Sequence, residues 1–189
     1  MVELWVGTRC SASTDTYMKE ESLASIRPAT PADFAAIRAV VHEVWPIAYR
    51  EMITPEQIRF MLEWMYSDES LSKQMTEEGC VFLVYEEDNL IQGFASFSEI
   101  EPALFKLHKL YVYTTSHGKG IGKALLNGVK RQAKVRGGKA LELQVNKKNI
   151  AQQFYLKQGF TIDRELVLDI GEGFVMDDYV MKTLLGTED

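Results

Sequence analysis

The spacing of apolar residues predicts helices in the N-terminal third of the chain. Two segments place apolar side chains mostly three or four positions apart, which is the repeat of one helix face. Each segment follows a threonine and a proline, at 30–31 and at 54–55, and this pair suits an N-cap and the first helical position. A shorter third helix is expected over 69–78, ended by Gly79. The apolar positions of the longer helices are Phe34, Ile37, Val40, Val41 and Val44, then Ile58, Met61, Leu62 and Met65.

After Gly79 the pattern changes to that of strands. Runs rich in β-branched and aromatic residues occupy 81–85, 91–98 and 104–113, and Glu87-Asp88-Asn89 supplies a turn between the first two. Short connections between consecutive strands favour antiparallel pairing. The sequence therefore predicts an antiparallel series of strands here.

The last of these strands has an irregular alternation. Phe105 and Leu107 place apolar side chains at odd positions, whereas Leu110 and Val112 place them at even positions. One extra residue near 108–109 would restore a single apolar face, and a β-bulge inserts such a residue. The alternative is that both faces of the strand are buried, in which case the alternation carries no information. A bulge would bend the strand and leave main-chain groups free to bond a ligand.

The C-terminal half alternates between helices and strands. We expect helices over 120–136 and 150–158, and strands over 140–145, 160–168 and 179–184. A β-α-β-α-β order makes at least one pair of strands parallel, because a helix carries the chain back along the sheet. The predicted class is therefore α/β, with a mixed sheet that is mostly antiparallel.

Size and composition point to one domain. The chain has 189 residues, of which 46% are hydrophobic, and this supports one core with little left for a second. We expect a single domain over 23–186 and leave 1–22, rich in serine and threonine, as an N-terminal extension without an assignment. The formal charge of -6 disfavours binding to nucleic acid or to an anionic membrane surface and favours a cationic partner.

The cysteines and histidines do not cluster along the chain. Cys10 and Cys80 lie far apart, and the 3 histidines are equally scattered. A zinc site needs several ligands at short spacings, so we predict no metal. The cysteine usage fits a reducing compartment, and the apolar run at 4–6 is too short for a signal peptide or a membrane span. We expect a cytoplasmic protein.

The densest chemical signal is the glycine-rich segment 117–126, between the irregular strand and the helix that follows it. Its glycines let the backbone approach a ligand closely, and free N–H groups at the start of a helix form an anion site. Lys119 and Lys123 add positive charge. The segment therefore predicts a phosphate site.

Three known phosphate-binding motifs can be compared with this segment, and the spacing of its glycines distinguishes between them. A Walker loop would need glycine at 117 and serine or threonine at 124, where the chain has His117 and Ala124. A dinucleotide fingerprint from Gly118 would need its third glycine at 123, which is a lysine. The remaining pattern, [Gln/Arg]-x-x-Gly-x-[Gly/Ala], fits at Gly120 and Gly122, and here the sequence resembles the GNAT acetyltransferases. The histidine at 117 departs from that pattern.

A second segment strengthens this resemblance, which extends from about Ser25 to Leu185. The strand 141–146, then Asn149, then the run 154–160 is similar to the family's strand, asparagine and "FY-x-x-x-GF" helix. The resemblance implies a GNAT fold, with a sheet of about six to seven strands, about four flanking helices and a V-shaped cofactor cleft. It also implies acetyl-CoA as the co-substrate.

The resemblance assigns roles to particular residues. The main chain of the bulged strand would hold the pantetheine arm of the donor, and the glycine-rich loop would hold its diphosphate. Tyr155 matches the tyrosine that protonates the departing thiolate, a role open to a phenol because it is neutral at pH 7. The alternative for Tyr155 is an aromatic residue that packs its helix onto the sheet. The implied donor-binding residues are Leu110, Tyr111, Val112, His117, Gly118, Lys119, Gly120, Ile121, Gly122, Lys123, Asn149 and Tyr155.

The acceptor side of the reaction needs a base, because a cationic amine must lose a proton before it attacks. The candidates are Glu99 and Glu101 near the hairpin end and His108 beside the expected bulge. The alternative for each is a solvated surface residue or a packing residue without a catalytic role. A chain of water molecules can also remove the proton in place of a side-chain base. A backbone N–H at the bulge could polarise the thioester carbonyl. In this fold the acceptor pocket lies between the first two helices and the final strands, where we expect Trp45, Tyr49, Met52 and Tyr179.

The expected function is N-acetylation of a small-molecule amine, such as a polyamine or an amino acid, by direct transfer. The tail "DDYVMKTLL" looks like family members related to bacterial polyamine acetyltransferases. Acetylation of a protein or peptide is one alternative, a CoA-binding sensor without turnover is another, and a nucleotide-phosphate enzyme such as a kinase is a third. We expect no nucleic-acid or membrane partner, and a homodimer is compatible with the sequence.

Overall fold

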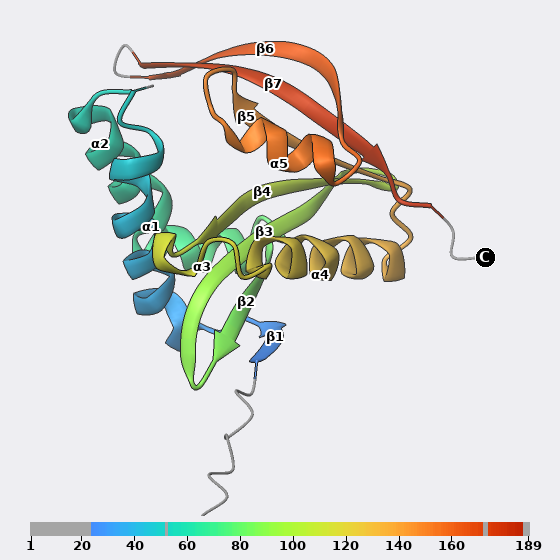
Figure 1. Ribbon diagram of the computed structural model, residues 1–189, viewed down its shortest axis with the longest axis horizontal. Coiled ribbons are helices and arrows are strands. Elements are labelled where there is room, and N and C mark those ends of the chain that lie inside the picture. The colour runs from blue at the N-terminus through green and yellow to red at the C-terminus, as the bar shows by residue number, and fades with distance from the viewer. Residues whose placement is uncertain (1–23, 52, 172–173, 187–189) are drawn as a thin grey trace, which may run out of the picture.

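One mixed sheet organises the computed structural model, which describes residues 24–51, 53–171 and 174–186 (Figure 1). The strands are β1 (Ala24–Pro28), β2 (Val81–Glu87), β3 (Leu90–Glu101), β4 (Leu104–Val112), β5 (Ala140–Asn146), β6 (Thr161–Gly171) and β7 (Phe174–Leu184). Their order is β1-β2-β3-β4-β5-β7-β6, and only β4 and β5 among these neighbours run parallel. This confirms the predicted class and sheet. The extension expected over 1–22 lies outside the described residues.

Helices cover both faces of this sheet (Figure 1). They are α1 (Phe34–Ala48), α2 (Pro55–Tyr66), α3 (Asp68–Thr76), α4 (Ile121–Val135) and α5 (Ala151–Lys157). The apolar sides of α1, α2 and α3 pack on one face with Phe82 and Phe94, whereas α4 and α5 pack on the other face with Leu141 and Leu143. The sheet thus separates two cores, and we name its faces after α1 and α4.

A short 3₁₀ turn, Pro31–Asp33, precedes α1, so the helix begins at Phe34 rather than at the proline. The carboxylate of Asp33 accepts the N–H of Thr30 at 2.7 Å and pairs with Arg27 at 2.9 Å. Arg27 lies on β1, a strand too short for the apolar pattern to predict. The turn therefore ties the first strand to the first helix.

The irregularity in β4 is a β-bulge. Ser96 of β3 pairs with Lys109, and the next residue, Phe97, pairs with Leu107, so His108 is inserted without a partner. The insertion explains the change of parity along the strand, and the predicted bulge is confirmed. The apolar side chains that consequently share the α4 face are Phe105, Leu107, Leu110 and Val112.

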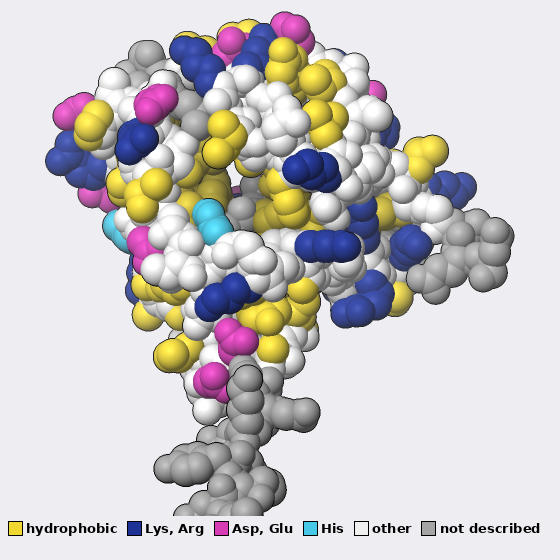
Figure 2. All heavy atoms as spheres, in the orientation of Figure 1, with side chains coloured by type: hydrophobic (Ala, Val, Ile, Leu, Met, Phe, Trp, Pro, Cys, Tyr) yellow, Lys and Arg dark blue, Asp and Glu magenta, His cyan; other side chains and the backbone are white. Residues whose placement is uncertain are grey.

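The parallel strands β4 and β5 separate beyond the bulge. They pair only over 104–107 and 140–143, while β5 stays paired with β7 as far as Asn146 and Asp178. The main-chain groups on this edge of β4 therefore have no strand partner. Figure 2 shows the surface hollowed between the two strands, above the start of α4. This is the V-shaped cleft that the resemblance implied.

Candidate active site

The glycine-rich segment forms a loop at the start of α4. Gly118 and Gly120 both have a φ of 81°, a left-handed conformation that other residues rarely adopt. Gly120 is the N-cap of α4, and it has no side chain to bond the first N–H groups of the helix. A Cβ atom at either glycine would meet no heavy atom within 4 Å. The loop therefore offers open backbone donors and room for a ligand.

The charges at this helix start favour an anion. The first turn of α4 carries no acidic residue, and Lys119 and Lys123 are exposed beside the free N–H groups. The positive end of the helix dipole acts in the same direction. The segment fits the diphosphate of a coenzyme A donor, the group that the sequence resemblance assigned to it.

His117 links the loop to the end of β4. Its Nε2 lies 3.1 Å from the carbonyl oxygen of Val112, and since a carbonyl only accepts, the ring donates this hydrogen bond. The bond holds the loop against the strand whose edge is open to the cleft. The histidine that departs from the family pattern thus has a structural role here.

Tyr155, on α5, lies within electrostatic reach of Tyr111, on the part of β4 that has no partner on its β5 side. Its ring packs against Phe154 and Phe160, with centroids 5.2 and 5.7 Å apart, so the packing role considered from the sequence is present. Its hydroxyl makes no hydrogen bond to the described residues. Burial, with a smaller contribution from the nearby Tyr49, raises the pKa of this phenol above its usual value. The hydroxyl therefore keeps its proton at neutral pH and can donate it.

Asn149 fixes the start of the helix that carries Tyr155. Its Oδ1 accepts the N–H of Ala151 at 2.8 Å, a local bond typical of asparagine before a helix. The side chain is half-buried at the end of the loop after β5. Its observed contact therefore positions α5, and its expected place beside the donor stays a prediction.

Of the residues expected at the acceptor, Tyr49 is the one whose polar end reaches β4. Its hydroxyl lies 3.1 Å from that of Tyr111. Trp45 is only 2% exposed, and its ring packs 4.9 Å from Tyr49 and 6.0 Å from Tyr111, so it supports the pair from behind. Met52 lies outside the described residues, and Tyr179 packs on the α4 face, away from α1.

The candidate base His108 occupies the bulge. Its Nε2 forms a 2.8 Å hydrogen bond with the hydroxyl of Ser98. The residue keeps some exposed surface, but desolvation of the ring and the charges of Lys109 and Lys106 lower its pKa to about 4. His108 is therefore neutral at pH 7 and a weaker base than an ordinary histidine.

The candidate base Glu99 serves a turn instead. Its carboxylate accepts the N–H of Ala103 at 2.9 Å, within the connection between β3 and β4. Glu99 pairs with Phe105, near the start of β4 and at the opposite end of that strand from Val112. Glu101 is exposed in the same connection. The structure does not bring these glutamates to the cleft.

Asp178, a residue without a predicted role, lies on β7 beyond the point where β4 and β5 separate. It pairs across from Asn146 at the end of β5 and accepts a hydrogen bond from the Nδ2 of Asn146 at 3.5 Å. The residue is 2% exposed, and burial raises the pKa of its carboxyl group. The available signal was the alternation of Met176, Asp178 and Val180, which puts a carboxylate on an otherwise apolar face.

Comparisons of this chain with known protein families and relatives agree with this geometry. Residues 49–175 match the acetyltransferase (GNAT) domain. The chain belongs to the GNAT family. It is also 30% identical over 150 residues to uncharacterised N-acetyltransferases of Mycobacterium bovis and Mycobacterium tuberculosis, and the match covers 79% of this chain and 96% of each relative. The resemblance seen in the sequence and the predicted enzyme class, an N-acetyltransferase, are confirmed.

Solved GNAT structures share the fold. The PaiA N-acetyltransferase of Thermoplasma acidophilum, in complex with coenzyme A, has a TM-score of 0.74 and 24% identity, over 86% of this chain and 99% of its own. YncA of Salmonella typhimurium, described as an acetyltransferase with its cofactor acetyl-CoA, has a TM-score of 0.61 and 23% identity, over 89% and 97% of the two chains. The predicted co-substrate, acetyl-CoA, agrees with both.

In the part of this GNAT chain that the structure describes, no three His, Cys, Asp or Glu side chains come together as a metal site. None of the described helices is long and apolar enough to cross a membrane. The cytoplasmic location and the homodimer stay predictions.

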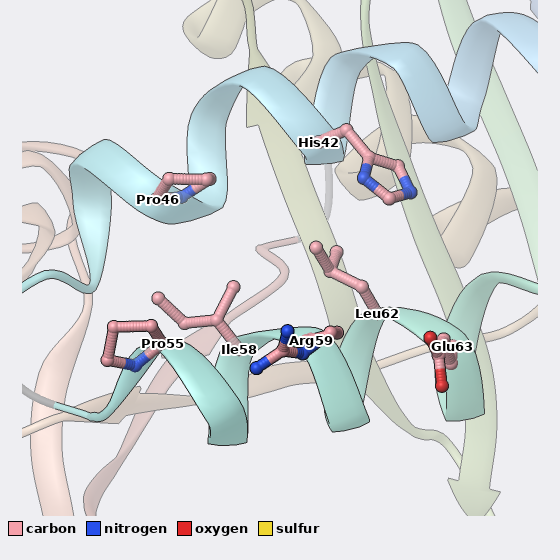
Figure 3. A pocket seen from close by; sticks show the side chains of 7 residues that line it. All are labelled: His42, Pro46, Pro55, Ile58, Arg59, Leu62 and Glu63. Atoms are coloured by element: carbon pink, nitrogen blue, oxygen red, sulfur yellow. The ribbon is translucent and has the colours of Figure 1, made fainter.

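A separate groove lies between α1 and α2, with a volume of about 290 Å³ (Figure 3). Neither Tyr49 nor Tyr155 lines it, so it is distinct from the cleft between β4 and β5. The residues that line it are His42, Pro46, Pro55, Ile58, Arg59, Leu62 and Glu63.

Proposed function

We propose that this GNAT protein transfers an acetyl group from acetyl-CoA to the amine of a small molecule, by direct transfer. The observation that carries the proposal is the cleft itself, where the open edge of β4 lies between an uncapped helix start and the phenol of Tyr155. Family membership supports the donor, as do the complexes of PaiA and YncA with coenzyme A and acetyl-CoA.

The glycine-rich loop and β4 would bind different parts of the donor. Backbone N–H groups over 118–123 would bind the diphosphate, with Lys119 and Lys123 adding charge. Main-chain groups of Leu110, Tyr111 and Val112 on the edge without a strand partner would bond the amides of the pantetheine arm, as they would an added strand. Bound acetyl-CoA supplies the acetyl group and a thiolate as the leaving group.

Tyr155 would act as the general acid. Burial raises the pKa of its hydroxyl, so the proton is present at neutral pH and is available to a thiolate. The ring is held by Phe154 and Phe160, and the helix that carries it is held by Asn149. A positioned acid of this kind contributes about 10²- to 10⁴-fold to the rate.

The charge and the packing of the acceptor side favour a small cationic amine. The chain carries a formal charge of -6, which attracts cations. Met176 of β7 packs against the cluster of α1 and α2 that contains Trp45 and Ile58. Met176 thus brings β7 close to this cluster, and a narrow space beside it would suit a slender acceptor better than a folded protein surface.

The test is acetyl transfer to a panel of acceptors. Diamines, polyamines and amino acids would be compared with peptides that have a free N-terminus or a lysine, by following thiol release from acetyl-CoA. We expect transfer to small amines and a loss of about 10²-fold or more in Tyr155→Phe. Thiol release with peptides alone would show that the protein acetylates proteins or peptides instead of small molecules. If calorimetry shows that CoA binds but no acceptor releases thiol from acetyl-CoA, the protein is a CoA sensor. If CoA does not bind at all, the proposal is wrong.

A further inference from the structure

A buried carboxylate faces the acceptor side of the cleft. Asp178 lies on β7 opposite Asn146, at the level where β5 has already left β4. Met176 shares its face of β7, because alternate residues of a strand point the same way, and Met176 packs against the core cluster that α1, α2 and α3 form with β2 and β3. Asp178 therefore points into the space between β7 and these helices.

This carboxylate lacks the partner that a buried charge requires. Asp178 is 2% exposed, and its one hydrogen bond within the described chain is the 3.5 Å contact from Asn146. No ion pair of the described residues includes it, whereas its neighbour Asp177, an exposed residue on the opposite face of β7, pairs with Lys147 at 2.7 Å. An unpaired buried charge disfavours the fold. A cationic ligand at Asp178 would relieve that cost.

Charged and polar groups surround Asp178 from several elements. Burial dominates and raises the pKa of its carboxyl group, and the charge of Asp177 acts in the same direction. The hydrogen bond from Asn146 opposes this shift, as do the more distant charges of Lys106 on β4 and Lys147 after β5. Tyr49, at the end of α1, also lies within electrostatic reach, since the charge of Asp178 adds to the effect of burial in raising the pKa of the Tyr49 hydroxyl.

We propose that Asp178 binds the ammonium group of the acceptor and removes its proton, with the hydroxyl of Tyr49 as a second contact. This inference rests on the proposed function, and it names the acceptor class: a primary amine that is protonated at pH 7. An ammonium ion forms its strongest hydrogen bonds with a carboxylate. The site lies on the α1 face of the cleft, and Tyr155 approaches the same cleft from the α4 face.

The proton balance closes with residues of this chain. The acceptor nitrogen gives one proton to Asp178, and its lone pair forms the N–C bond while the C–S bond of the thioester breaks. The sulfur takes the proton of Tyr155, and Tyr155 recovers a proton from the nitrogen as the amide forms. The proton on Asp178 then leaves to solvent. The products are the N-acetyl amine and the free thiol of CoA.

The test compares Asp178→Asn with Asp177→Asn on two acceptors of similar size. n-Butylamine is cationic at pH 7, whereas 2,2,2-trifluoroethylamine is neutral there, so only the first needs the base. We expect Asp178→Asn to lower kcat/KM for n-butylamine by about 10²-fold or more and to change that for 2,2,2-trifluoroethylamine by at most about threefold. Asp177→Asn, the same change on the exposed face, should stay within about twofold of the parent with both.

Two outcomes of the kinetics would overturn the proposal: equal losses with both acceptors, or an unchanged rate with n-butylamine. The melting temperature is a third check. Asp178→Asn should melt no lower than the parent, because the amide removes a buried charge. A lower melting temperature would show that the carboxylate is needed for the fold, and it would also overturn the proposal.

Calorimetry separates a failure of this site from a failure of the proposed function. The protein saturated with CoA should bind n-butylamine, and Asp178→Asn should bind it at least about tenfold more weakly, with or without turnover. If CoA binds and no small amine is acetylated, the proposed function fails, and this binding result still decides the site. Equal binding by parent and variant, or none by the parent, would refute an ammonium site at Asp178.

Discussion

The hydroxyl of Tyr49 lies 3.1 Å from the hydroxyl of Tyr111. Tyr49 directly follows α1, and Tyr111 lies on the part of β4 that has no strand partner on its β5 side. Both rings also pack against Trp45. One hydrogen bond thus joins the acceptor side of the cleft to the strand proposed to hold the donor, and it directs the polar end of Tyr49 toward the place where they meet.

Tyr49→Phe should lower the free energy of unfolding by about 1 kcal/mol, because the hydroxyl of Tyr111 loses its partner while the ring still packs on Trp45. It should also raise KM for the amine more than it lowers kcat, since in the proposed site Tyr49 contacts the acceptor and does not transfer a proton. Urea denaturation and steady-state kinetics measure the two effects. Tyr85→Phe is the control, because the hydroxyl of Tyr85 bonds no described residue. An unchanged KM in Tyr49→Phe would show that Tyr49 does not contact the acceptor.

Gly120→Ala and Gly122→Ala should differ sharply in their effects on CoA binding and on stability. Gly120 has a φ of 81°, so a Cβ there costs about 1–2 kcal/mol and distorts the loop. Gly122 lies inside α4, and a Cβ there would come no closer than 3.8 Å, to the ring of Phe154, so alanine should stabilise the helix by up to about 1 kcal/mol. We expect Gly120→Ala to weaken CoA binding by about tenfold and Gly122→Ala to leave it nearly unchanged.

Calorimetric titration with CoA and a melting curve for each variant check this pair. Equal weakening in both variants would mean that any side chain near the helix start blocks the ligand, whatever the backbone conformation. Full CoA binding by Gly120→Ala would show that the left-handed glycine does not shape the site.

The features that the sequence predicted are local ones. The bulge at His108 follows from a change of parity within one strand, and the open loop at the start of α4 follows from glycines next to a helix pattern. Both depend on residues within a few positions of one another, where steric rules act directly. The family pattern then added the number of strands and the V-shaped cleft.

The features that the sequence did not predict depend on contacts between distant segments. Asp178 becomes a buried, unpaired carboxylate only because β7 lies beside β5 and faces α1 and α2. Glu99 became a turn residue because Ala103 turns back within its reach. Neither burial nor the partner of a carboxylate can be read from alternation alone, since alternation gives the face of the strand and not what covers that face.

Lys109 should make stability depend on pH in alkaline solution. It is 6% exposed, its Nζ bonds Gln74 at 2.5 Å, and burial lowers its pKa to about 8. The unfolded chain, with an ordinary lysine, binds more protons between pH 8 and the usual pKa of 10.5, so stability rises with pH over that range. Lys109→Met should lack this rise, which is roughly 3 kcal/mol at about 1.4 kcal/mol for each pKa unit.

Urea denaturation of parent and Lys109→Met at several pH values from neutral to alkaline measures the difference. Lys73→Met, on the exposed side of α3, should keep the pH dependence of the parent. If Lys109→Met and the parent gain equally with pH, then Lys109 stays charged in the fold and its burial does not control its protonation.

His117→Ala should weaken CoA binding by about five- to tenfold, because the loop loses the hydrogen bond that ties it to β4 and must be ordered by the ligand. His117→Gln should retain most of the affinity, since a glutamine amide can donate to the same carbonyl of Val112. Hydrogen exchange of the amides over 118–122 adds a readout without ligand, and it should be faster in His117→Ala alone. If alanine and glutamine weaken binding equally while exchange is unchanged, the ring of His117 contacts the donor itself rather than holding the loop in place.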